Sequence, residues 1–250
     1  SPVYNIYSGR LESSTEYKIE SDISTSGNKL LVNTITSKIN IGYDVNNGNM
    51  LKYDEIVDRQ GHARVQTQRR ALAYNNLGQT VYYHDTITNL TGAVNLNTDI
   101  YFGDDDANSL TSPAVKISYD IYGNMVQYSE FKVEQDKNDS TILNTAAKTT
   151  RTNIDYSHAG QMTSYTEVTD RDGQAKQETV RGSMAYNELG QILYYHDSIT
   201  NLNRLNQTDA AVNLQTDIYF GVNDVNAANT FPSTLTAVDY DNYGRLQNYT

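Results

Sequence analysis

The tetrapeptide Tyr-Tyr-His-Asp occurs twice in the chain, at residues 82–85 and again at residues 194–197. A histidine oriented by an aspartate is the pair of residue types that serves as a general base in many hydrolases. Adjacent side chains of a β-strand point to opposite faces, however, so the two residues cannot orient each other. No Gly-x-Ser-x-Gly sequence supplies a nucleophile for such a base. The pattern therefore predicts a repeated structural strand, and we expect no catalytic residues and no enzyme.

A second candidate site consists of oxygen ligands for a metal. Asp104, Asp106 and Asn108 in the segment FGDDDAN have the alternate spacing found at the start of calcium-binding loops. In the related segment FGVNDVN at residues 220–226, Val222 stands in the place of Asp104. A repeated Ca²⁺ site would lose a carboxylate by this change. We therefore expect a solvated acidic loop and no cofactor, with Ca²⁺ as the alternative.

The third candidate is a ligand-binding face. Alternation along a strand places Tyr82 with His84, and Tyr194 with His196, on one strand face. Rings arranged in this way could stack on sugars, and exposed aromatic patches often mark interaction sites. Cross-strand packing of a tyrosine ladder, which itself stabilises sheets, explains the same pattern. The sequence leaves both interpretations open.

The two tetrapeptides belong to a longer duplication, which indicates a repeated supersecondary unit. Residues 73–88 read AYNNLGQTVYYHDTIT, and residues 185–200 read AYNELGQILYYHDSIT. Inside this block lies a shorter motif, Tyr-[Asp/Asn/Ser]-x-x-Gly-[Gln/Asn/Arg]. Its regular copies are residues 74–78, 119–123, 156–160, 186–190 and 240–244, and residues 4–9 and 43–48 contain one extra residue. Repeats of this kind usually stack copies of one structural unit.

The spacing within the motif predicts a tight hairpin. Asp or Asn at the first turn position can accept hydrogen bonds from backbone amides two residues on, as expected for Asn75, Asp120, Asn187 and Asp241. The glycine three residues later supplies the positive φ of a three-residue loop closed by a bulge. These glycines are Gly78, Gly123, Gly160, Gly190 and Gly244. Another tyrosine follows the glycine by five residues in six copies, so aromatic residues are expected on both arms.

The segments between the turns alternate between apolar and polar residues, which is typical of strands. Alternation predicts, for example, that Ile35, Ile39, Ile41 and Tyr43 share one face. Apolar residues at helical spacing are nowhere sustained. We therefore expect an all-β protein in which tandem antiparallel β-hairpins form an extended, curled meander, either a solenoid or a shell-like sheet.

The intervals between successive motif tyrosines are 39, 31, 45, 37, 30 and 54 residues, which describes a three-hairpin cycle. The first cycle covers residues 4–118 and the second residues 119–239, while residues 240–250 begin a third. EYKIE at residues 16–20 returns as EFKVE at 130–134, in agreement with this period. The whole chain, residues 1–250, is thus expected to be one fragment of a repeat array.

The composition excludes several classes of partner. A formal net charge of −11 disfavours binding to nucleic acid and to anionic membrane surfaces. No apolar run approaches the roughly 20 residues needed to span a bilayer, so membrane insertion is not expected. Twenty-one tyrosines with no tryptophan and no cysteine indicate a thin sheet whose rings lie close to water.

Two segments carry a resemblance to a known family: YDNYGRLQNYT at residues 240–250 and ISYDIYGNMVQYSE at residues 117–130. They resemble the YD repeats of bacterial rearrangement-hotspot (Rhs) proteins and of teneurins. The resemblance implies antiparallel strands wound into a large spiralling sheet or shell on a secreted or surface protein. The intervals are longer and less even here, and Asn or Ser replaces Asp in several motifs.

From these observations we expect a structural tandem-repeat segment, a stalk, wall or shell of a large extracellular or cell-surface protein. Its partners would be neighbouring repeats of the same chain. The alternative is an adhesin-type module that recognises glycan or protein through a tyrosine-rich face. A third hypothesis is a spacer stiffened by Ca²⁺. Hairpins of the same cycle position at both ends of the chain also predict weak end-to-end self-association, which screening of the negative charge strengthens.

Overall fold

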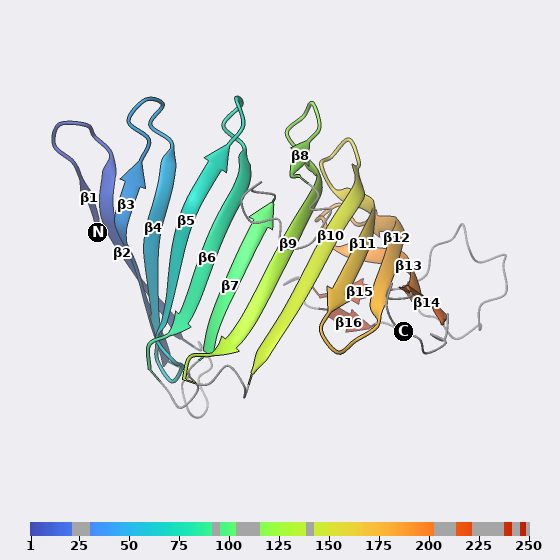
Figure 1. Ribbon diagram of the computed structural model, residues 1–250. Helices are drawn as coiled ribbons and strands as arrows, with labels where there is room; N and C mark the ends of the chain where they lie inside the picture. The colour runs from blue at the N-terminus through green and yellow to red at the C-terminus, as the bar shows by residue number, and fades with distance from the viewer. Residues whose placement is uncertain are drawn as a thin grey trace. The chain divides into compact units, whose positions relative to one another are not determined.

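The computed structural model describes residues 1–21, 31–91, 96–103, 116–138, 143–202, 214–221, 238–241 and 246–248. Every regular element among these residues is a β-strand, and they contain no helix, as Figure 1 shows. Accordingly, none of them forms a helix long and apolar enough to cross a membrane. The all-β prediction is confirmed.

The described residues form sixteen strands. They are β1 (Pro2–Tyr4), β2 (Leu11–Ser21), β3 (Leu31–Tyr43), β4 (Met50–Arg59), β5 (Val65–Tyr74), β6 (Thr80–Asn89), β7 (Leu96–Gly103), β8 (Ser118–Tyr119), β9 (Met125–Asp136), β10 (Asn144–Tyr156), β11 (Met162–Arg171), β12 (Lys176–Tyr186), β13 (Ile192–Leu202), β14 (Gln215–Phe220), β15 (Asp239–Tyr240) and β16 (Leu246–Asn248). The main sheet follows the chain from β1 to β14, with β8 paired to β9, and β15 pairs β16 separately. Its strands form an open antiparallel meander, as the hairpin pattern predicted.

The described motif turns all connect a strand to its immediate antiparallel neighbour. They link β1 to β2, β3 to β4, β5 to β6, β8 to β9, β10 to β11, and β12 to β13. Because successive strands reverse direction, motif turns alternate with the other connections along the meander. Figure 1 shows the first three motif turns at the upper ends of their strands.

The hairpin between β5 and β6 has the hydrogen bonds of a three-residue loop. The Asn75 N–H donates to the Gln79 carbonyl at 2.9 Å, and the Gly78 N–H donates to the Asn75 carbonyl at 3.0 Å. Asn75 Oδ1 accepts from the backbone N–H groups of Leu77 at 2.9 Å and Gln79 at 3.0 Å. Gly78 has φ +77°, the left-handed conformation that glycine adopts without a steric penalty. The turn is therefore the predicted type I turn closed by a glycine bulge.

The same geometry recurs at Gly123, Gly160 and Gly190, whose φ angles are +88°, +75° and +78°. Gly244, the fifth predicted turn glycine, lies outside the described residues. The longer motif at residues 4–9 closes one residue later, since the Gly9 N–H donates to the Asn5 carbonyl at 2.9 Å. The side chain after the glycine also contributes: Asn124 Nδ2 donates to Asp120 Oδ2 at 2.9 Å, and Asn75 Nδ2 donates to Gln79 Oε1 at 2.7 Å.

A β-bulge interrupts the strand that enters four of these hairpins. Arg70 is opposite His84 and Ala73 is opposite Tyr82, so β5 uses one residue more than β6 over this stretch. Corresponding register shifts occur in β3, β10 and β12. Each bulge contains a non-glycine residue with positive φ: Asn40, Ala71, Asn153 or Ser183. An extra residue of this kind bends the strand and increases its local twist.

The bulge in β3 corrects one prediction from alternation. Ile39 is opposite Asp54 and Gly42 is opposite Lys52, and these two β4 residues share a face. Gly42, and not Ile41, therefore follows Ile39 on that face. The predicted common face is therefore wrong for Ile41, because the extra residue reverses the alternation after Ile39. A second register shift places Tyr43 opposite Met50, on the same face of β4 as Lys52 and Asp54.

Few side chains are buried, and they lie both beside the motif turns and farther along the strands. Seven apolar side chains of the described residues are buried, and none of these residues has a fully buried side chain. Four of the seven precede a motif tyrosine by two positions: Leu72, Ile117, Ile154 and Val238. The sheet thus has small, repeated apolar clusters in place of one thick core, as the tyrosine-rich composition indicated.

The chain divides into two compact units. The first contains Ser1–Ala114 and Glu130–Ala146, and the second contains Val115–Ser129 and Ala147–Thr250. The division passes through β9, so these units differ from the sequence cycles of residues 4–118 and 119–239. Each unit nevertheless contains one copy of the duplicated Tyr-Tyr-His-Asp block, and each can be described by itself.

Replacement of a turn glycine should destabilise the fold through backbone strain. We predict that Gly190→Val lowers the free energy of unfolding by about 1–2 kcal/mol, since a β-branched residue is strained at positive φ. Urea denaturation of the full chain measures this change. Gly182→Val is the matched control in β12, because a Cβ at Gly182 meets no other heavy atom within 4 Å. Equal losses in the two variants would contradict the assigned turn.

Candidate functional site

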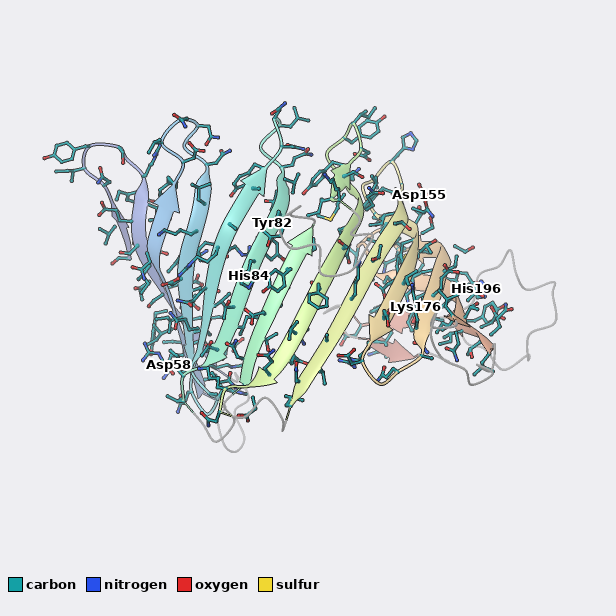
Figure 2. All side chains as sticks on the ribbon, viewed as in Figure 1. Asp58, Tyr82, His84, Asp155, Lys176 and His196 are labelled. Carbon is teal, nitrogen blue, oxygen red and sulfur yellow. The ribbon has the colours of Figure 1, made fainter. Side chains whose placement is uncertain are left out.

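The tetrapeptide Tyr-Tyr-His-Asp lies in β6 and again in β13, where its residues point alternately to the two sides of the sheet. We call the side that carries Tyr83 and Asp85 in unit 1, or Tyr195 and Asp197 in unit 2, the arginine face. The side that carries Tyr82 and His84, or Tyr194 and His196, is the histidine face. Figure 2 labels Tyr82 and His84 on unit 1. As predicted, His84 and Asp85 do not pair with each other.

On the arginine face of unit 1, Arg69 of β5 joins three strands. In register it is opposite Tyr53 of β4 and Asp85 of β6. Its Nε donates to Asp85 Oδ1 at 2.7 Å, and its Nη2 donates to Asp85 Oδ2 at 2.6 Å. Its guanidinium carbon lies 3.9 Å from the ring centre of Tyr83 and 5.5 Å from that of Tyr53. One cation therefore makes a bidentate ion pair and two cation–π contacts.

The contacts continue on both sides of Arg69. Lys38 Nζ of β3 lies 4.2 Å from the ring centre of Tyr53. On the other side, the Tyr83 ring stacks on Phe102 of β7 with 4.9 Å between ring centres. Five strands of unit 1, β3 to β7, are thus linked by one row of alternating cations and rings.

Unit 2 repeats this row. Arg181 of β12 donates to the two carboxylate oxygens of Asp197 at 2.6 and 2.5 Å. Its guanidinium carbon lies 3.9 Å from the Tyr195 ring centre and 5.4 Å from that of Tyr165. Tyr195 stacks on Phe220 of β14 with 5.0 Å between ring centres.

Arg151 extends the row of unit 2 by two strands. Its Nε donates to Glu167 Oε2 at 3.0 Å. Its guanidinium carbon lies 4.2 Å from the ring centre of Tyr165 and 5.6 Å from that of Tyr128 in β9. The two rows therefore share one plan, in which each arginine has a carboxylate and two rings as neighbours.

The carboxylates of the arginine face are committed to these pairs. Asp85 and Asp197 are each 5% exposed, and a buried carboxylate is stable only when it is paired and hydrogen-bonded. The hydrogen bond with Asp85 raises the pKa of Arg69, although burial opposes this shift. The hydrogen bond with Asp197 acts in the same way on the pKa of Arg181. The aspartate of Tyr-Tyr-His-Asp is thus the anchor of a cross-strand arginine.

The histidine face brings together a different aspartate and the histidine. His84 Nε2 lies 3.0 Å from Asp99 Oδ1 of β7, and the His84 ring stacks on Tyr101 with 4.2 Å between centres. Unit 2 repeats the pair, with 3.0 Å between His196 Nε2 and Asp217 Oδ1. His196 also stacks on Tyr219, at 4.3 Å between centres. Sequence reasoning missed this pair, although the duplicated segment NTDIYF and its copy QTDIYF provided the signal.

This His–Asp pair does not have the geometry of a catalytic triad. The Thr86 hydroxyl lies 2.7 Å from Asp99 Oδ1 and 3.5 Å from His84 Nε2. Both the aspartate and the hydroxyl therefore approach the same imidazole nitrogen. A triad uses one nitrogen to hold the orienting carboxylate and the other to receive the proton of the nucleophile. In unit 2, Ser198 stands at the position of Thr86 and accepts from Gln215 Nε2 at 3.3 Å.

The predicted ligand face requires a correction. Tyr82 is 4% exposed and Tyr194 is 3% exposed, so neither ring presents a face to a sugar. Tyr82 has small neighbours in register on both sides, Ala73 and Gly103, which leave room for the ring against the sheet. The side chains of His84 and His196 are 26% and 31% exposed, and each is already stacked on a tyrosine.

The candidate calcium ligands Asp104, Asp106 and Asn108 lie outside the described residues. Among the residues that the structure describes, no cluster of three or more His, Cys, Asp or Glu side chains could hold a metal ion.

The tyrosine that opens the motif connects consecutive hairpins. Its hydroxyl donates to the carbonyl of the second residue after the glycine of the preceding hairpin. This hydrogen bond joins Tyr43 to Leu11 (2.9 Å), Tyr156 to Met125 (2.8 Å), Tyr186 to Met162 (2.6 Å) and Tyr240 to Ile192 (2.7 Å). Tyr74, also within the described part of the chain, does not form it. The regular position of tyrosine in the motif was the available signal for this contact.

Comparison of the chain with protein-family models, with curated proteins and with solved structures gave no match. The repeated geometry of the two faces is therefore the basis for assigning a function.

The arginine row can be tested by removing one cation. We predict that Arg181→Met lowers the free energy of unfolding by about 2–4 kcal/mol, because it leaves the buried Asp197 carboxylate without its partner. Arg59→Met is the control, since Arg59 pairs with Glu20 at 3.5 Å on an exposed surface and should change stability by about 0.5 kcal/mol or less. Adding Asp197→Leu to Arg181→Met should restore part of the loss. Similar values for all three variants in urea denaturation would refute the role of the row.

Ionisation of the motif tyrosines should lower the free energy of unfolding at alkaline pH. Burial raises the pKa of Tyr156 and of Tyr186 above the usual value. A raised folded-state pKa contributes stability that is complete below about pH 10 and is lost as the pH rises through that pKa. We predict that Tyr156→Phe with Tyr186→Phe costs about 1 kcal/mol per hydroxyl at neutral pH. Its urea midpoint should then decline less than that of the parent chain above about pH 10. Parallel declines would contradict the assigned hydrogen bonds.

Proposed function

We propose that the chain is a structural tandem-repeat segment, a stalk, wall or shell of a large extracellular or cell-surface protein. The observation that carries this proposal is the repetition of the same two connections between strands. Cross-strand arginine rows link the sheet within each unit, and motif tyrosine hydroxyls link one hairpin to the next. The duplicated His-Asp sequence supports this reading, since its aspartate anchors a strand-bridging arginine.

The function that follows is mechanical. In a meander each hairpin contacts its neighbours, so stability is approximately a sum of hairpin terms and interface terms. The tyrosine hydroxyl acts at these interfaces. The arginine joins the two arms of its own hairpin through the aspartate pair and contacts the preceding hairpin through Tyr53 or Tyr165, so each folded hairpin offers contacts to its neighbour. An array built on this plan gains length without requiring a thicker core.

The resemblance of the motif to YD repeats favours the same function. In that family the repeats imply a secreted or surface location, which we propose here as well. A net charge of −11 is compatible with a solvated extracellular surface.

A second candidate, an adhesin-type binding module, is favoured by the tips of the motif turns. The turns expose large apolar side chains at their central positions. Single exposed residues of this size are common on protein surfaces. Their repetition from turn to turn is not required by the turn geometry and is typical of an interaction surface. In unit 1 these residues are Ile6, Tyr7, Val45 and Leu77, and in unit 2 they are Ile121, Tyr122 and Leu189, all more than 80% exposed. The ligand would then contact the turns and not the buried Tyr82 and Tyr194.

Mechanical unfolding of the full chain tests the structural proposal. Held at its two ends, the chain should unfold in successive steps under force, because its hairpins depend on local interfaces. Arg181→Met should lower the force of the steps in unit 2 and leave those of unit 1 unchanged, while Arg69→Met should do the reverse. A single all-or-none step that both variants weaken equally would overturn the proposal.

A glycan and protein array distinguishes the binding alternative. Ligand binding that is lost in Leu77→Asn with Leu189→Asn, at unchanged stability, would favour the adhesin function.

A further inference from the structure

The strands β7 and β14 are two copies of one sequence, NLNTDIYFG and NLQTDIYFG. Each pairs in the same register with the Tyr-Tyr-His-Asp strand of its unit. Ile100 is opposite Asp85 and Ile218 is opposite Asp197. The ring stacks described above are also the same in the two units. One edge of β14 therefore has the same neighbours as the corresponding edge of β7.

The second edge differs between the copies. β7 pairs along its length with β9, from Leu96 opposite Asp136 to Phe102 opposite Glu130. In the described part of the chain, β14 ends the strand order of the sheet, with β13 as its neighbour. The β7–β9 pair thus shows how the corresponding edge of β14 can be covered.

The burial of matching residues follows this difference. Thr98 of β7 is 6% exposed, whereas its counterpart Thr216 is exposed. Ile100 is partly buried, whereas Ile218 is 42% exposed. The segment Gln215–Ile218 is exposed throughout, although the matching residues of β7 are buried or partly buried. A single additional strand would account for this change, since exposed strand edges pair readily with extended segments.

We propose that the edge of β14 at Gln215–Ile218 is a docking site for one strand with the sequence pattern of Glu130–Asp136, paired antiparallel. The inference deepens the proposed array function and rests on it, because the occupant is a strand of another repeat of this type. The register of β7 with β9 assigns the contacts. A lysine in the position of Lys132 lies opposite Ile218, and a valine in the position of Val133 lies opposite Asp217.

The chemistry of the occupant is set by the same register. In unit 1 the Lys132 position faces Ile100, so its aliphatic stem can cover an apolar side chain while the ammonium stays in water. The strand β1 does not match this pattern. It has three residues, Pro2–Tyr4, and Pro2 lacks the N–H that a ladder requires. We therefore assign the occupant to the β9 type, to which the EYKIE segment of β2 also belongs, and not to β1.

A synthetic peptide with the sequence of residues 129–137, SEFKVEQDK, tests the site on the full chain. Fluorescence anisotropy of the labelled peptide measures binding, and hydrogen exchange locates it. With the peptide at about ten times its Kd, exchange at those amides of 215–218 that point away from β13 should slow about tenfold, while β1 and β2 stay unchanged. A peptide of the same composition in scrambled order should not protect these amides.

A substitution that places two lysines opposite each other tests the register. Ile218→Lys places a lysine opposite the peptide lysine, and binding should weaken about fivefold because like charges directly opposite destabilise a strand pair. A peptide with glutamate at that lysine should bind the Ile218→Lys chain at least as well as the original peptide binds the parent. Val180→Lys, at an exposed position of the interior strand β12, should leave binding unchanged.

Three results would overturn the inference: no protection at 215–218 with saturating peptide, protection at β1 in its place, or binding of the original peptide that is unchanged by Ile218→Lys. These failures leave the stepwise unfolding under force untouched, so they are separable from failure of the structural function.

Discussion

A sheet without a thick core must be held together across its strands, and in this protein the cross-strand arginine performs that task. Each of Arg69, Arg151 and Arg181 lies between two tyrosine rings and pairs with a carboxylate on the next strand. The planar guanidinium suits both contacts, because it stacks on a ring and presents a fork of donors to a carboxylate. A lysine at the same position would provide a point charge and lose the bidentate geometry. The alternation of rings and charges along the strands follows from this requirement.

The two units differ in a way that separates essential from dispensable contacts. In unit 1, Arg70 forms a further ion pair with the buried Asp54 on the histidine face. Burial alone would raise the pKa of Asp54, but hydrogen bonds from Asn40 and Arg70 lower it overall. Gly182 stands at the position of Arg70 in unit 2, so this pair has no counterpart there. The arginine row is present in both units, and the duplicated plan of the sheet therefore depends on it more than on the second pair.

Local features were predictable from the sequence, and those that depend on pairing were not. The turn at Gly78 follows from residue types within five positions, and the all-β fold follows from the turn spacing. The bulges were missed because no single residue type marks them: asparagine occupies two of the positive-φ positions, and alanine and serine occupy the others. The Arg69–Asp85 pair and the burial of Tyr82 depend on the register between strands. The His84–Asp99 pair depends on it as well, and alternation alone does not give that register.

The bulge has a consequence for how such a chain can grow. Each bulge lies opposite the tyrosine five residues after the motif glycine. The register between the two arms of each of these hairpins therefore shifts by one residue. The intervals between motifs change from 45 to 54 residues at the longest step of the cycle and from 39 to 37 at another. The register inside each hairpin is fixed by its own turn and bulge, so a longer or shorter connection between hairpins does not alter it. Hairpins of this kind can therefore be joined by connections of different lengths, as the unequal intervals in this chain show.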